Sequence, residues 1–387
     1  MTNDWTYLIY LLLGALLFLG SSPVGKGQWN EEYTSLKQTK MLQGFTALLI
    51  AFHHMSQKTC APWKPQRYMV HGLDPFIPMG YMLVGFFLFC NGLGLYKSLK
   101  NKPNYLHGFV RRRIVPLIIA YYLSEIIYLA LRLVMGQQMT STEILWYLSG
   151  LHMANTNGWY LIVLPFFCLA FRAAFRFCKR EGTAILLVFL FTLAYTVLGA
   201  SIDHQNDWWM RGEWWYNSIL LFPLGLLFAK FEAKITAFFR KGYWLWLVVS
   251  IAAVFLLFRA SQFLNNGVWG YYGSGPMKVP HRLMSAAFEW LVSLAYVWTC
   301  FLIMMKVRFG NPILKGLGLI TLEFYLMHGM FVELFGFNFL ELTPSLVYIR
   351  NVPLYVAAVL ACSVPAALIF RFIWKKLSGR IVPRETT

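Results

Sequence analysis

Residues 43–54 read QGFTALLIAFHH, an apolar run that opens with Gln43 and Gly44 and ends in two adjacent histidines. At 3.6 residues per turn, Gln43 and His54 share one stripe of a helix and lie about 16 Å apart along its axis. A hydrophobic helix needs no imidazole for stability, and in lipid a polar side chain costs free energy unless it is paired or faces a polar cavity. We therefore expect a transmembrane helix whose histidine end carries a functional site.

Composition supports a membrane protein. Of the 387 residues, 58% are hydrophobic and only 13% are charged, and the mean hydropathy is +0.54, whereas soluble domains are about 45–50% apolar and about 25% charged. The net charge of +18 is spread in short basic blocks between apolar runs, which is the pattern of membrane topology and not of a nucleic-acid-binding face. We expect no nucleic-acid partner.

The six cysteines predict neither a disulfide framework nor a zinc site. Five of them lie within or at the ends of apolar runs, and only Cys60 falls in a predicted outer loop. No C-x-x-C spacing occurs, so we interpret the cysteines as small hydrophobic residues and expect no metal.

The apolar runs predict an all-α, polytopic membrane protein of about eleven transmembrane helices. The first run has no Lys or Arg before it, so we expect a retained helix and not a signal peptide. The predicted helices cover residues 5–20, 41–57, 78–97, 114–135, 158–177, 184–200, 215–230, 244–261, 284–305, 316–336 and 352–374.

The distribution of basic residues gives an orientation. One alternating set of loops holds 25 of the 34 Lys and Arg residues, and the other set holds 9. The positive-inside rule places the first set in the cytoplasm, with the N-terminus outside and the C-terminus inside. The cytoplasmic set is 21–40, 97–113, 172–182, 230–243, 304–316 and the C-terminal tail; the outer set is 57–78, 132–157, 201–214, 259–284 and 336–352.

His54 is the first catalytic candidate, with His53 beside it. An imidazole can act as a general base on a hydroxyl at neutral pH, or accept an acyl group transiently. The alternative is a helix-end histidine that rests at the membrane interface. Neighbouring residues point about 100° apart around a helix, so the two histidines cannot face one site equally.

Arg111, Arg112 and Arg113 form the second candidate, at the cytoplasmic start of an apolar run. Three guanidinium groups suit a phosphate-bearing donor such as a nucleotide-linked thioester. Ordinary positive-inside anchoring predicts basic residues at the same place.

A late apolar run contains Glu323, Tyr325 and His328. A glutamate and a histidine within one apolar run are expensive in a membrane. Tyr325 and His328 are three residues apart and share a helix face, whereas Glu323 faces a different neighbour. Hydrogen bonding between helices is the alternative to a catalytic role.

Two further carboxylates, Glu125 and Glu289, lie within apolar runs. They could pair with Arg132 or Arg259, or serve as the partner of a catalytic histidine, and the sequence does not choose between these roles.

The outer loops at 201–216 and 260–283 are rich in Trp, Tyr, Gly and Asn. Their aromatic rings could stack on sugars or form the usual belt at the membrane interface. We favour the belt for Trp208, Trp209, Trp214 and Trp215, and regard segment 265–275 as less belt-like.

Five short motifs, in order, resemble those of the acyltransferase family 3 membrane proteins over residues 37–376. Gln43-Gly44 followed by His54 is similar to the family's Arg-Gly start with its histidine. The others are the Phe-rich helix end with Asn91 and Gly92, the Arg-rich stretch from Phe109 to Pro116, the helix start Asn157-Gly-Trp159-Tyr160, and the late helix with Thr321, Glu323, Tyr325 and His328.

The resemblance implies a ten-helix domain at 37–376. Residues 1–36 would then be an additional N-terminal transmembrane helix with a cytoplasmic linker, and 377–387 a short cytoplasmic tail. It also implies an acyl-coenzyme A donor bound from the cytoplasm near the arginines.

This chain departs from the family pattern at three positions. Gln43 replaces the family's arginine, although Lys40, one turn earlier, could substitute in donor binding. Asn91 and Thr321 each replace a serine.

These observations lead to the hypothesis of an O-acyltransferase of the plasma membrane, acting in the cell envelope. It would transfer acetyl or another short acyl group from acetyl-CoA or another acyl-CoA to a hydroxyl of an extracytoplasmic glycan or related acceptor. His54 would be the base, and Glu323, Tyr325 and His328 would support it. The alternatives are a transporter or flippase of a polar glycan or lipid-linked intermediate, and an inactive relative acting in envelope assembly.

Overall fold

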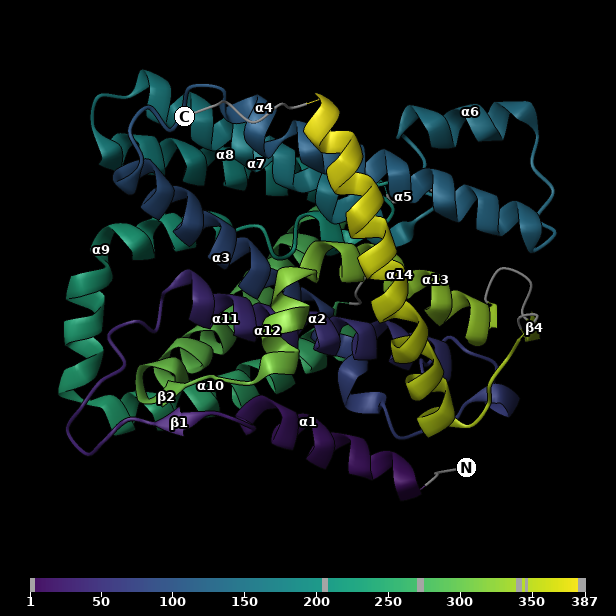
Figure 1. Cartoon of the computed structure of the whole chain (residues 1–387), viewed down its shortest axis with the longest axis horizontal. Coiled ribbons are helices and arrows are strands. Elements are labelled where there is room, and N and C mark those ends of the chain that lie inside the picture. The colour runs from purple at the N-terminus through teal and green to yellow at the C-terminus, as the bar shows by residue number, and fades with distance from the viewer. Residues whose placement is uncertain (1–3, 204–207, 270–274, 339–342, 345–346, 382–387) are drawn as a thin grey trace.

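The computed structural model describes residues 4–203, 208–269, 275–338, 343–344 and 347–381. Most of this part of the chain is helical and very little of it is strand, which confirms the predicted all-α class (Figure 1). The α-helices are α1 (Leu8–Phe18), α2 (Leu36–Thr59), α3 (Gly80–Asn101), α4 (Phe109–Arg113), α5 (Val115–Val134), α6 (Ser141–Ser149), α7 (Trp159–Phe177), α8 (Glu181–Ser201), α9 (Leu221–Lys241), α10 (Tyr243–Phe263), α11 (Lys278–Lys306), α12 (Pro312–Leu319), α13 (Thr321–Phe335) and α14 (Val352–Ile381).

Short elements join these helices. Two antiparallel pairs of two-residue strands are present, β1 with β2 and β3 with β4. The short elements are η1 (Asp4–Tyr7), β1 (Ser22–Pro23), η2 (Gln66–Tyr68), η3 (Asp74–Met79), η4 (Thr156–Gly158), η5 (Glu213–Trp215), the π-helical turn η6 (Leu264–Val268), β2 (Val307–Arg308), β3 (Phe337–Asn338) and β4 (Thr343–Pro344).

Within the described residues, seven helical segments are long and apolar enough to cross a membrane, or eight if a bent pair counts as one span. The chain is thus a polytopic membrane protein, although the sequence predicted eleven such spans. Helices α2 and α9 are not among the seven, and α9 is kinked at Phe231. Helix α1 has 11 residues, or about 16 Å, roughly half of a hydrocarbon core of about 30 Å.

The predicted helix at 316–336 is broken into α12 and α13, which meet at 87°. Asn311 starts α12 by accepting hydrogen bonds from the backbone N–H groups of Ile313 and Leu314. The Thr321 hydroxyl then donates to the carbonyls of Leu317 and Gly318, and so binds the last turn of α12. The break turns α13 towards α2.

Helix α6 was not expected from the sequence. Helix α6 lies in the predicted outer loop 132–157 and begins with a capping box, in which Thr140 and Glu143 bind each other's backbone N–H groups. Its nine residues are too few to cross a membrane, so α6 leaves the alternation of the loops unchanged.

The two predicted sets of loops separate in space. In the basic set, Lys97 forms an ion pair with Glu232 at 2.8 Å and Lys100 with Glu181 at 2.6 Å, which joins the ends of α3, α8 and α9. In the other set, Lys278 pairs with Asp203 at 2.5 Å. Each of these ion pairs therefore joins loops of one predicted set.

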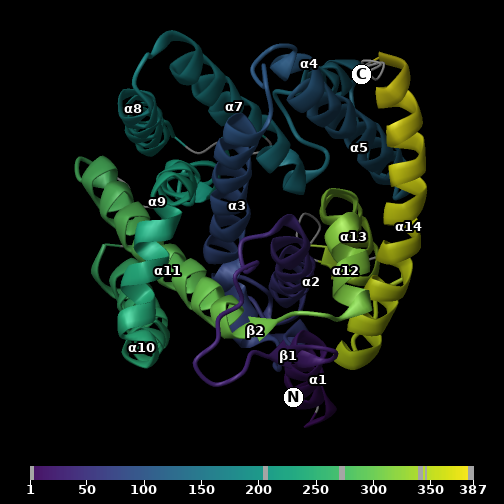
Figure 2. The same cartoon turned by 60° about the vertical axis from the view of Figure 1, so that its left-hand side comes forward.

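Helix α2 lies at the centre of the bundle, between α3 and α13 (Figure 2). It approaches α12 most closely at Gly44 and Gly318, where a Cβ atom on either residue would overlap the backbone of the facing helix. A side chain at residue 44 would therefore collide with α12, and the close contact fixes α2 against the broken helix.

Helix α1 is fastened near both of its ends. The Tyr10 hydroxyl donates to the Gly72 carbonyl at 2.7 Å, and the Tyr10 ring stacks on Phe76 at 5.4 Å between centroids. At its other end the Asn311 amide donates to the Leu16 carbonyl at 2.7 Å, and β1 pairs with β2. Helix α1 thus connects the two groups of loops.

Candidate active site

The site centres on His54 of α2 and His328 of α13, whose Nδ1 and Nε2 atoms are 2.6 Å apart. His328 Nδ1 lies 2.9 Å from the Phe324 carbonyl oxygen, which can only accept, so Nδ1 of His328 carries the proton. With both rings neutral, His328 Nε2 is then an acceptor and His54 Nδ1 donates to it. Nε2 of His54 is left with a lone pair, as a general base requires.

His53 is held differently from His54. Its Nδ1 donates to the Phe76 carbonyl at 2.9 Å, and its Nε2 accepts from the Gln57 amide at 3.3 Å. A Cβ atom on Gly80 would lie 2.6 Å from His53 Nε2, so the ring is packed tightly against the start of α3. Both nitrogens of His53 are therefore engaged, whereas Nε2 of His54 takes no hydrogen bond from a described residue.

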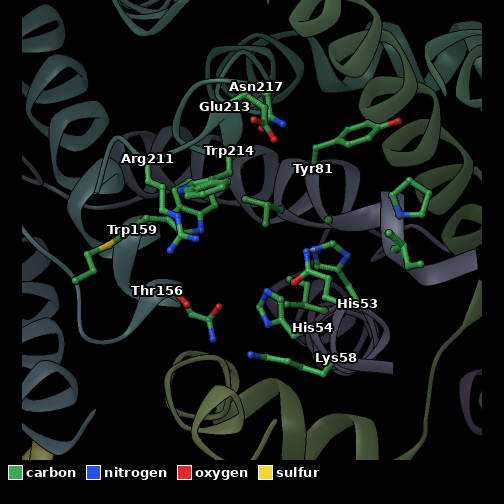
Figure 3. A pocket seen from close by; sticks show the side chains of 18 of the residues that line it. His53, His54, Lys58, Tyr81, Thr156, Trp159, Arg211, Glu213, Trp214 and Asn217 are labelled. Carbon is green, nitrogen blue, oxygen red and sulfur yellow. Dashed lines mark hydrogen bonds between the residues drawn. The ribbon is translucent and has the colours of Figure 1, made fainter. Parts of the chain in front are cut away.

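A cavity of about 1520 Å³ adjoins His53 and His54. His53, His54 and Lys58 approach it from α2, and Tyr81, Trp159 and Trp214 line other parts of its wall (Figure 3). Of the two histidines on this wall, only His54 has an unprotonated ring nitrogen that makes no hydrogen bond with a described residue. The cavity is large enough to admit a sugar ring to that nitrogen.

Tyr325 also lines the cavity and continues the site towards the bundle interior. Its ring lies 6.1 Å from the His328 ring and 5.9 Å from the Tyr160 ring, between centroids. The Asn91 amide donates to the Tyr160 hydroxyl at 2.8 Å. A row of polar side chains thus runs from Asn91 to His54.

The aromatic candidates divide into two groups. Trp159, Trp208 and Trp214 line the cavity, where their rings can stack on a ligand. Trp215 is 1% exposed and packs with Trp209 at 5.1 Å between centroids. A belt at the membrane interface, as predicted, therefore does not account for Trp208, Trp209, Trp214 and Trp215 together. Part of the predicted segment 265–275 lies outside the described residues.

Glu323 lies apart from the cavity, in a basic cluster that we define as Lys40, Arg113, Arg371 and Lys375. Its carboxylate is 4.0 Å from the Arg371 Nε atom and interacts electrostatically with Lys40 and Lys375. Arg113 in turn lies within electrostatic range of Lys40. The structure thus places Glu323 at the basic end of the bundle and not beside His54.

The three arginines of α4 differ in their contacts. Arg112 donates to the carbonyls of Tyr105 and His107, at 2.9 and 2.5 Å, and so holds the loop before α4. Arg113 Nε donates to the Tyr105 hydroxyl at 3.1 Å, and Arg111 is exposed. Arg113 is the one that faces the basic cluster.

Gln43 lies between the basic cluster and the histidines. It is half-buried, and its amide is within hydrogen-bonding reach of the Cys90 thiol. The structure therefore brings Lys40 and Gln43 to the basic end of α2 and His54 to the opposite end, as the helical stripe predicts.

The two remaining carboxylates stabilise the fold locally. Glu125 accepts hydrogen bonds from the backbone N–H groups of Ala154 and Asn155, at 2.6 and 3.1 Å. It thereby anchors the loop before η4, and η4 carries the cavity residues Thr156 and Asn157. Glu289 accepts from the Asn265 amide at 3.5 Å. Neither carboxylate contacts a histidine of the site.

Four cations on the cavity wall were not identified as site residues from the sequence: Lys58, Arg132, Arg211 and Arg282. Lys58 could have been found, because it follows His54 by four residues and so shares its helix face. Arg211 gave no signal, since it is a lone arginine in an aromatic loop. Its approach to His54 depends entirely on tertiary structure.

Residues 39–372 match the family model described as an acyltransferase domain, that of acyltransferase family 3. The match covers most of the chain, which therefore belongs to this family and is a multi-pass membrane acyltransferase. Searches of curated proteins and of solved structures each returned no match. Helix α1 lies outside the matched residues.

Proposed function

We propose that this protein is an O-acyltransferase of the plasma membrane that uses an acyl-CoA, most simply acetyl-CoA, to acylate a hydroxyl of an extracytoplasmic glycan. The single observation that carries the proposal is the His54–His328 hydrogen bond. It leaves an imidazole lone pair, with a defined tautomer, at the wall of a cavity that can hold a sugar ring.

In this mechanism His54 Nε2 takes the proton of the acceptor hydroxyl while the hydroxyl oxygen attacks the thioester carbonyl carbon. The carbon–sulfur bond then breaks, and the coenzyme A thiolate leaves with the proton returned from the His54 imidazolium. His328 orients the base by accepting its Nδ1–H, and the Tyr325 hydroxyl can stabilise the developing oxyanion. No covalent acyl-enzyme is needed.

The donor would approach from the opposite end of α2. Lys40, Arg113 and Arg371 would neutralise its phosphates, with Arg111 and Arg112 adding positive charge at the entrance. The thioester lies far from these phosphates along the donor molecule, and the polar row from Asn91 to Tyr325 leads towards His54. With the basic loops in the cytoplasm, this arrangement carries an acyl group across a membrane that the donor itself cannot cross.

The test uses purified protein and acetyl-CoA labelled in the acetyl group. Wild-type protein should transfer label to envelope glycan, or release labelled acetate slowly without acceptor. His54→Ala should lower transfer by about 10²-fold or more at normal protein level, while His107→Ala, an exposed histidine outside the cavity, should not. Wild-type rates in His54→Ala would remove His54 from the mechanism.

A transporter is the second candidate, because the break between α12 and α13 resembles the discontinuous helices of secondary transporters. A transporter would move its glycan without consuming thioester. Dependence of the labelled product on acetyl-CoA therefore separates the two functions, and an inactive relative would show neither activity.

A further inference from the structure

Arg211 is the feature of the cavity that the proposed mechanism does not use. It precedes η5, is exposed, and lines the cavity. Its guanidinium group forms no ion pair or hydrogen bond with a described residue. Figure 3 shows the side chain reaching into the cavity beside Trp214.

Two more cations, Lys58 and Arg132, line the same cavity. Lys58 interacts repulsively with both Arg211 and Arg132, and attractively with Glu333. In Figure 3, Arg211 lies above the His54 ring and Lys58 lies below it. Lys58, one helical turn beyond the proposed base on α2, thus lies within electrostatic range of two arginines and one carboxylate on the wall of the same cavity.

The other charged groups on the cavity wall are engaged elsewhere. Asp203 pairs with Lys278 at 2.5 Å. Arg282 donates to the carbonyls of Ala200 and Ile202, at 3.0 and 2.9 Å. Glu213 lies on the side of Asn217, away from Lys58 (Figure 3). Arg132 donates to the Ala154 carbonyl at 2.8 Å. Since the Arg211 guanidinium has no such partner among the described residues, it is the strongest candidate for a ligand contact.

Like charges repel, and the repulsion is strong where solvent is restricted. Such a cluster is stabilised when an anion binds among its members, and a guanidinium group offers paired N–H donors to the two oxygens of a carboxylate or phosphate. The aromatic walls formed by Trp159 and Trp214 suit the flat face of a sugar ring. Together these groups fit an acidic sugar better than a neutral one.

We propose that the acceptor is an acidic glycan, and that Arg211 and Lys58 bind its carboxylate or phosphate so that a neighbouring hydroxyl lies at His54 Nε2. This inference rests on the proposed function, because it names the acceptor class of the same site. It assigns Arg211 to acceptor recognition and not to proton transfer.

The experiment compares 4-nitrophenyl β-glucuronide with 4-nitrophenyl β-glucoside, which differ in having a carboxylate or a hydroxymethyl group. Binding to the full chain in detergent is measured first by thermal shift without donor, and acetyl transfer is measured second. Wild-type protein should prefer the glucuronide by about tenfold or more in affinity, as expected for hydrogen bonds to a charged group.

The variants are Arg211→Gln, Arg211→Lys and, as a matched control, Arg259→Gln, which removes an exposed arginine outside the cavity. Arg211→Gln should abolish the preference, Arg211→Lys should retain part of it, and Arg259→Gln should retain all of it. A phosphorylated sugar tested in the same way distinguishes carboxylate from phosphate as the bound anion.

Three results would overturn this inference: equal binding of the two glycosides, a preference that survives in Arg211→Gln, or no binding of either at millimolar concentration. A raised KM for acetyl-CoA in Arg211→Gln would also contradict it, by assigning the cations to the donor. Because binding is measured without donor, absence of acetyl transfer with intact glucuronide preference would contradict only the proposed function.

Discussion

The imidazole planes of His54 and His328 are within 1° of parallel, with ring centroids 4.9 Å apart, although 274 positions separate the two residues in the chain. The bend at the α12–α13 junction makes this possible, because it turns α13 towards the end of α2. The base and its orienting partner therefore depend on two helices whose relative position is set by the Gly44–Gly318 contact.

Replacing His328 should show that it positions His54 and does not itself react. His328→Ala removes the acceptor of the His54 Nδ1–H group, and we expect kcat to fall by about 10²-fold with little change in the KM for acetyl-CoA. His328→Gln can accept from His54 through its amide oxygen, so it should recover part of the loss. Steady-state kinetics of the two variants checks this, and equal losses in both would contradict a positioning role.

Lys40 should bind the donor in place of the arginine that Gln43 replaces. We expect Lys40→Gln to raise the KM for acetyl-CoA by about tenfold, since one charge-assisted contact to a phosphate is lost. Lys37→Gln is the matched control, because Lys37 is exposed on the same end of α2. Gln43→Arg should lower the KM. Equal KM values in the two lysine variants would exclude Lys40 from donor binding.

The contact of α2 with α12 should be intolerant of any side chain at residue 318. Alanine normally stabilises a helix by about 0.5–1 kcal/mol relative to glycine, but a Cβ atom on Gly318 would overlap the Lys40 carbonyl oxygen. Gly318→Ala should therefore lower the free energy of unfolding by about 1–3 kcal/mol. Gly316→Ala, with nothing within 4 Å of its Cβ atom, should raise it, and thermal unfolding in detergent compares the two.

Because of Lys64, in the loop after α2, the free energy of unfolding should change with pH in the alkaline range. The Lys64 ammonium group donates to the Lys58 carbonyl at 2.9 Å, and burial lowers its pKa from 10.5 to about 8. Between about pH 8 and about pH 10.5 the unfolded chain then binds more protons at this lysine than the folded chain, so stability rises with pH. The melting temperature of the wild type should rise relative to that of Lys64→Met over this window. If the melting temperatures of the two proteins changed in parallel with pH, the lowered pKa of Lys64 would be contradicted.

Much of the fold was accessible from the sequence, because membrane insertion depends on local composition. Apolar runs predicted most helices, and the alternation of basic loops predicted that the partners of the Lys97–Glu232 and Lys278–Asp203 ion pairs belong to the same set of loops. The break at residue 320 was not predicted, because no proline and no run of polar residues marks it, and the sequence on both sides of it is mostly apolar.

The site was predicted in part for the same reason. Gln43 and His54 share a helix stripe, so their separation follows from helix geometry alone. The His54–His328 hydrogen bond and the place of Arg211 depend on contacts between distant segments, which hydrophobic periodicity does not encode. Glu323 illustrates the limit most clearly, because its sequence position near His328 says nothing of the cations it meets at the other end of the bundle.

The attachment of α1 has a consequence for biosynthesis. Its Leu16 carbonyl and strand β1 bind residues 307–311, which leave the ribosome almost 300 residues later. Helix α1 must therefore wait, unattached at that end, until the chain has been made as far as residue 311. Docking of α1 is then a late step in assembly, and its completion reports that the C-terminal half has reached its place.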